Sequence, residues 1–118
     1  MTIKTPLSAE KKLMVLFHVE PGCLGPDGIS LVTEYCDIAQ KKIEKIDSDY
    51  IAWCITPRTD KTLPELQFNI DGKLLSREQA EKYLSLFDID IDELEAKLYE
   101  NITDLVEEFL GRNWTADQ

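Results

Sequence analysis

The sequence has no long apolar run, and this absence limits where the chain can reside. Uninterrupted apolar stretches such as Leu13 to Phe17 are far shorter than the roughly 20 residues of a membrane-spanning helix. No small-residue cleavage site follows it, so we do not expect a secretory signal. The three cysteines cannot all pair within the chain, and they form neither a CxxC motif nor a repeated Cys/His spacing. These features predict a cytoplasmic protein without a membrane partner or a zinc site.

Basic residues are also scarce. The 118 residues include 13 Lys and Arg against 23 Asp and Glu, a net charge of -10, and the sequence pI is about 4.5. Because an acidic surface repels phosphate backbones, we expect no nucleic-acid partner. Most of the charge is local: residues 86–110 hold nine acids and one base, which is -8, whereas the remaining 14 acids and 12 bases leave -2.

The apolar content of 43% is sufficient for one core, and periodicity divides the chain into elements. We expect a loosely held arm over 1–10, a single domain over 11–112 and a tail over 113–118. Within the domain, apolar spacing and turn residues predict strands at 12–19, 50–56, 66–70 and 73–75, and helices at 28–46, from 76 and at 91–110. Asp27 and Ser76 are predicted N-caps, and Gly111 is predicted to end the last helix.

This order, β-α-β-β-β-α-α, predicts an α+β fold with one mixed sheet and helices packed on it. A strand-helix-strand unit makes the first two strands parallel. Both strands are apolar on their two alternating faces, which predicts that each is covered on both sides. The short link from Arg58 to Leu63 predicts that the second and third strands are antiparallel neighbours.

Two loops are expected at the same edge of this sheet, just outside the carboxyl ends of the parallel strands, where ligands tend to bind. They are EPGCLGPDG, residues 20–28, and PRTDK, residues 57–61. A helix N-terminus next to Cys23 can stabilise a thiolate, although a lone loop cysteine is more often unreactive. The candidate catalytic residues are His18, Glu20 and Cys23, and the candidate ligand-binding residues are Asp27, Arg58, Asp60 and Lys61.

Several other residues are predicted to have structural rather than functional roles. Cys36 and Cys54 lie on apolar stripes and are predicted core residues. The carboxylates of residues 88–93 alternate as in a calcium loop, but the glycine and the final glutamate of such a loop are absent, and we predict instead that Asp90 is a helix N-cap with Glu93 three residues later. With no Walker motif and no GxGxxG present, we predict neither a metal nor a cofactor.

The segment from Leu63 and Pro64 to Gly72, followed by a helix, resembles the proline, strand and glycine turn of thioredoxin-like domains. In those domains a loop cysteine also follows a first buried strand. The resemblance covers about a third of the chain. It implies a thiol role for Cys23 and a cis peptide bond at Pro64.

Two hypotheses of function follow. The first is a non-enzymatic binding or interaction domain that acts through dimer formation or through the acidic last helix, with Glu100, Asp104, Glu107 and Glu108 as partner-binding candidates. The second is a thiol-dependent or small-molecule-binding protein whose site includes Cys23, His18 and Arg58. Sequence alone leaves open whether the protein is an enzyme.

Overall fold

A computed structural model describes residues 7, 8 and 11–116, with side chains as far as residue 111. The predicted arm and tail therefore lie largely outside the described residues. The elements are β1 (Leu13–Val19), the short 3-10 helix η2 (Pro21–Leu24), α1 (Gly28–Ile43), β2 (Ile51–Pro57), β3 (Leu66–Ile70), β4 (Lys73–Leu75), α2 (Arg77–Ser85) and α3 (Ile91–Ala116).

The predicted α+β fold is confirmed, with one four-stranded mixed sheet in the order β2-β1-β3-β4. β1 and β2 are parallel, in a register that pairs Leu13 with Ile51 and Val19 with Pro57. β3 is antiparallel to β1, and β4 is antiparallel to β3. The β3–β4 hairpin turns at Asp71 and Gly72, whose φ angles of 50° and 82° are those of the tight turn that this dipeptide favours.

The expectation that the second and third strands are neighbours is wrong, because β1 lies between β2 and β3. The physical reason is the short distance involved. The two strands are antiparallel, so the link leaves and enters the sheet at the same edge and has to cross only two strand spacings, about 10 Å. Residues 58–65 span this distance without a helix.

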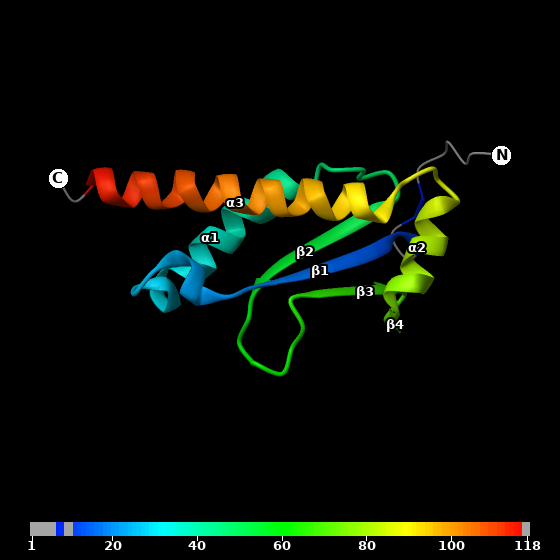
Figure 1. The fold of residues 1–118 in the computed structure, drawn as a ribbon, viewed down its shortest axis with the longest axis horizontal. Helices are drawn as coiled ribbons and strands as arrows, with labels where there is room; N and C mark the ends of the chain where they lie inside the picture. The colour runs from blue at the N-terminus through cyan, green and yellow to red at the C-terminus, as the bar shows by residue number, and fades with distance from the viewer. Residues whose placement is uncertain (1–6, 9–10, 117–118) are drawn as a thin grey trace.

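The helices bury one face of the sheet. On β1, Leu13, Val15, Phe17 and Val19 are almost completely buried, as are Ile51, Trp53 and Ile55 on β2 and Phe68 on β3. α1 packs on this face beside α3, and α3 runs along the length of the molecule (Figure 1). The Tyr35 hydroxyl of α1 donates a 2.8 Å hydrogen bond to the backbone oxygen of Ile102 in α3, which joins the two helices inside the core.

The opposite face of the sheet is only partly covered. Met14 and Leu16 on β1, and Ala52 and Cys54 on β2, are half-buried and lie outside the hydrophobic core. The expectation that both faces of these strands are covered is therefore not met by the described residues. The eight-residue link between β2 and β3 contains no helix that could lie over this face.

The structure confirms some of the predicted helix caps and contradicts others. Ser76 caps α2 in a complete capping box with Gln79, as predicted. The carboxylate of Asp90 accepts from the Asp92 amide, which supports its structural reading as a cap. Asp27 makes no side-chain cap bond at α1. α3 continues through Gly111 to Ala116, because glycine permits the left-handed C′ conformation but does not impose it.

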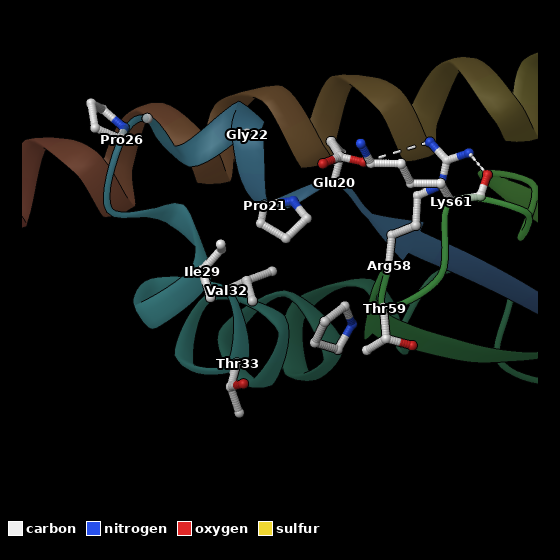
Figure 2. Close-up of a pocket in the computed structure, with 12 residues that line it drawn as sticks. Glu20, Pro21, Gly22, Pro26, Ile29, Val32, Thr33, Arg58, Thr59 and Lys61 are labelled. Carbon is white, nitrogen blue, oxygen red and sulfur yellow. Dashed lines mark hydrogen bonds and ion pairs between the residues drawn. The ribbon is translucent and has the colours of Figure 1, made fainter.

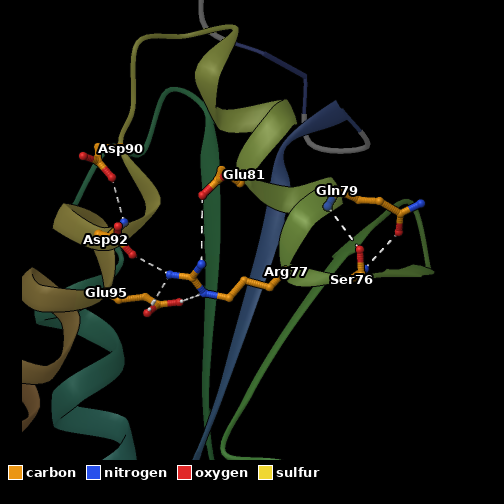
Figure 3. A network of polar contacts seen from close by, with 7 residues as sticks. All are labelled: Ser76, Arg77, Gln79, Glu81, Asp90, Asp92 and Glu95. Atoms are coloured by element: carbon orange, nitrogen blue, oxygen red, sulfur yellow. Dashed lines mark hydrogen bonds and ion pairs between the residues drawn. The ribbon is translucent and has the colours of Figure 1, made fainter.

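Arg77 connects the start of α2 to the first turn of α3 (Figure 3). Its guanidinium donates to the Asp92 carboxylate at 2.6 Å and to the Glu95 carboxylate at 3.1 Å, and it lies 4.0 Å from Glu81. These contacts hold the α2–α3 corner at the end of the sheet farthest from the loops described next (Figures 1 and 3).

Candidate functional site

A pocket of about 670 Å³ lies at the carboxyl ends of β1 and β2, between the loop that follows each strand (Figure 2). Its volume is within the range of small-molecule sites. The sequence placed a candidate site at this edge. The residues that line it are Glu20, Pro21, Gly22, Gly25, Pro26, Ile29, Val32, Thr33, Pro57, Arg58, Thr59 and Lys61.

One wall of the pocket depends on a close approach between η2 and the start of α1. A Cβ atom added at Gly28 would lie 1.8 Å from the backbone oxygen of Pro21. Only glycine therefore fits at the first position of α1 while η2 keeps its place. The side chain of Leu24, at the end of η2, is 2% exposed and anchors this turn in the core.

The facing loop is held by Arg58. Its backbone amide donates to the Val19 oxygen at 2.8 Å, which fastens the start of the loop to the end of β1. Its guanidinium donates to the backbone oxygens of Leu63, at 3.0 Å, and Lys61, at 2.9 Å, and lies 3.6 Å from the Glu20 carboxylate. Arg58 thus positions the loop, and its positive charge is largely balanced by Glu20.

Asp60 also has a structural role in this loop. Its carboxylate accepts a 2.9 Å hydrogen bond from the backbone amide of Thr62. The hydrogen bonds from Thr62 lower the pKa of Asp60, because they stabilise its charged form. Asp60 does not line the pocket.

The lining is mainly apolar, with a single unbalanced cation. Pro21, Pro26, Val32 and Pro57 supply apolar surface together with Ile29, whose side chain is 86% exposed. Apolar spacings of three and four within residues 28–46 predict that Ile29 lies on the buried stripe of the first helix. This prediction is wrong, because the helix begins at the pocket rim, where no core lies above it. Among the described residues, no carboxylate forms an ion pair with Lys61, which is exposed.

Of the predicted site residues, Glu20, Arg58 and Lys61 line the pocket, whereas His18, Cys23, Asp27 and Asp60 do not. His18 is 7% exposed, and its Nδ1 atom lies 2.8 Å from the backbone oxygen of Pro64. The alternation of β1 turns its side chain to the sheet face opposite the helices. The apolar lining of the pocket was not predicted from the sequence. The signal that could have identified it is the density of proline at and beside the two loops, at positions 21, 26 and 57.

Cys23 lies on η2 and is exposed. Partial burial, followed by the negative charge of Glu20, raises the pKa of its thiol. A nucleophilic cysteine needs the opposite shift, because the thiolate is the reactive form. The Arg58 charge is directed at Glu20 instead.

The other two cysteines differ from each other. Cys36 is a buried core residue as predicted, and burial raises its pKa to about 12. Cys54 is half-buried on the partly covered sheet face, so the prediction that it belongs to the core is wrong. Its strand alternates between a covered face and an open one, and Cys54 points to the open one.

The acidic residues proposed to bind a partner all lie on the outer side of α3. Glu100, Asp104, Glu107 and Glu108 are exposed, and Glu108 lies 4.0 Å from the Lys42 ammonium. Their role in binding a partner stays a prediction. Within the described residues, no cluster of three or more His, Cys, Asp or Glu side chains could hold a metal ion.

The described peptide bonds are all trans, including the one before Pro64, so the cis bond implied by the thioredoxin-like resemblance is not present. None of the helices in the described part of the chain has both the length and the apolar character needed to cross a membrane. No protein-family model matches the sequence, and neither a curated protein nor a solved structure shows significant similarity to it.

Proposed function

We propose that the protein is a non-enzymatic binding domain that holds a small apolar ligand with an acidic group in the pocket between η2 and the 58–63 loop. The observation that carries the proposal is Ile29. An isoleucine exposed to 86% at the rim of a 670 Å³ pocket offers apolar surface that the described residues leave uncovered.

The charges at the pocket favour an anionic group on the ligand. Glu20 is balanced by Arg58, which lies 3.6 Å away, so the unbalanced charge at the mouth is that of Lys61. A carboxylate or sulfonate near Lys61 would complete the charge balance, while the apolar part of the ligand covers Ile29 and the proline side chains.

The chemistry of the nearby side chains supports binding over catalysis. The pKa of Cys23 is raised, and neither Cys23 nor His18 lines the pocket. The side chains that do line it are mostly apolar, or, like Arg58, they are engaged in holding the loop. The thiol-dependent alternative has no comparable support.

The test uses 8-anilinonaphthalene-1-sulfonate, an apolar anion whose fluorescence rises on transfer to an apolar site. We expect saturable binding of one molecule per chain. Ile29→Ser should weaken it about tenfold, because roughly 1.4 kcal/mol of apolar contact is lost. Lys61→Gln should weaken the binding of this probe about threefold, because an exposed ion pair contributes less than about 1 kcal/mol.

The control is Leu86→Ser, which removes an equally large exposed side chain at the end of α2, away from the pocket. It should leave the affinity unchanged. Each variant is first checked for cooperative thermal unfolding, because a loosened core also binds this probe. If binding is absent, or if Ile29→Ser and Leu86→Ser bind alike, the proposed site is wrong.

A further inference from the structure

The partly covered face of the sheet is a second surface, distinct from the pocket. We define the open face as the side chains that point away from the helices and keep some exposure: Met14 and Leu16 on β1, Ala52, Cys54 and Thr56 on β2, Gln67 and Asn69 on β3, and Leu74 on β4; His18, on the same side of β1, is buried beside the Pro64 carbonyl and is left out. The strand registers align them in rows, so that Ala52, Met14, Asn69 and Leu74 form one row and Cys54, Leu16 and Gln67 the next.

The open face is unusual for a solvated face because it is apolar over the adjacent strands β1 and β2, whereas β3 contributes amide side chains. Met14 and Leu16 lie on β1, Ala52 and Cys54 lie on the neighbouring edge strand β2, and Leu74 is 67% exposed. A face that contacts only water normally alternates to polar residues at these positions. The two-sided apolar pattern of β1 and β2 is therefore explained by an additional layer on this face.

Charge identifies the chemistry of that layer. The open face contains no Asp, Glu, Lys or Arg, although charged residues make up 31% of the chain. A basic or acidic partner would find no complementary charge on it. Its polar groups are amides and hydroxyls, which can pair with groups of their own kind.

The same distribution makes a second copy of the chain a suitable occupant despite its net charge of -10. The acidic residues of 86–110 lie mainly on α3, which packs on the opposite face of the sheet. Two copies packed through their open faces would hold their α3 helices at opposite outer surfaces. With layer spacings of about 10 Å, the helices would be about 30 Å apart, several times the Debye length of about 8 Å.

We infer that the protein forms a two-fold symmetric homodimer in which the open faces of two copies pack against each other. Such an interface is isologous, because each copy contributes the same residues. The face measures about 23 Å along β1 by about 14 Å across four strands, which is small beside a standard interface of about 800 Å² per partner. The dimer should accordingly be weak and reversible, with a dissociation constant between about 1 μM and about 1 mM.

The mass of the full chain is measured by analytical ultracentrifugation from about 1 μM to about 1 mM, a range that brackets a weak interface. We expect it to rise from 13.5 kDa towards twice that value. Leu74→Glu should weaken association at least tenfold, because it brings a like charge from each copy into a neutral interface. Since Leu74 is exposed, the substitution should not unfold the chain.

Leu86→Glu is the matched control, because it adds the same charge at an exposed leucine outside the open face, and it should dimerise as the wild type does. A second readout needs no substitution. Maleimide should label Cys54 more slowly at high protein concentration than at low, whereas the rate at Cys23, on η2, should not change.

The inference is overturned if the wild type stays monomeric across the whole range. It is also overturned if a dimer forms but Leu74→Glu leaves its association unchanged and the labelling rate of Cys54 does not depend on protein concentration. The interface then lies elsewhere. Neither result bears on the pocket, which is at the end of the strands.

Discussion

Gly28→Ala tests whether the pocket wall is built as the structure indicates. The added Cβ would lie 1.8 Å from the Pro21 backbone oxygen, whereas atoms in contact are about 3.5 Å apart. The two backbone segments would have to separate by more than about 1 Å, which draws η2 and the buried Leu24 away from the core.

The magnitude follows from what this movement exposes. Loss of most of the Leu24 burial costs about 2–3 kcal/mol, and forced overpacking by itself typically costs about 1–3 kcal/mol. Alanine recovers at most about 1 kcal/mol through its helix propensity. The separation that relieves the overlap is the same movement that exposes Leu24, so the two costs are not added, and we expect the free energy of unfolding to fall by about 1–3 kcal/mol, which a domain of this size tolerates without losing its fold.

Gly111→Ala is the control, since it is the same substitution in a helix. Among the described residues, no atom other than those of the chain neighbours and the helix backbone lies within 4 Å of a Cβ added at Gly111, and Gly111 is exposed within α3. Here alanine should stabilise the protein by about 0.5–1 kcal/mol. Equilibrium urea unfolding, monitored by far-UV circular dichroism, measures the free energy of unfolding of both variants. With a slope of about 1–3 kcal/mol per molar, the Gly28→Ala midpoint should fall by roughly 1–2 M. A Gly28→Ala variant as stable as the wild type would refute the close approach of η2 and α1.

Two further predictions concern thiols and capping. Because burial raises the pKa of Cys36 from 9.0 to about 12, the folded state keeps this proton at a pH where the unfolded chain has lost it. Stability should therefore decline as pH rises from about 9 to about 12, and Cys36→Ala should flatten this decline in thermal melts. An unchanged alkaline slope in the variant would assign the decline to other groups. Ser76→Ala removes the capping box of α2 and should lower the free energy of unfolding by about 1 kcal/mol in urea titrations, whereas Ser48→Ala, in the exposed turn before β2, should have no effect.

Local elements were predictable because their determinants are local. The Asp71-Gly72 turn, the Ser76 capping box and the alternating strand residues each depend on neighbours within about four positions. The helix ends show the limit of this reasoning. Asp27 and Gly111 are suitable cap residues, but α1 begins without a side-chain cap bond and α3 continues past the glycine.

The candidate site was predictable in its place but not in its composition. Parallel strands direct both following loops to one edge, so the position of the pocket follows from the β-α-β order. Its lining depends on the turn of η2 and on the hydrogen bonds of Arg58, which join residues that sequence patterns treat separately. The thiol of Cys23 and the imidazole of His18 consequently lie outside it.

The sequence by itself determined an acidic α+β chain, its elements, the parallel first pair and the edge at which a site would form. Only the tertiary structure decided that β1 lies between β2 and β3, that Ile29 is exposed at the pocket and that Cys54 points to the open face. The physical reason is that periodicity reports which residues are apolar. Which of their two faces a chain covers depends on where its helices pack, and that is set by contacts between segments distant in the sequence.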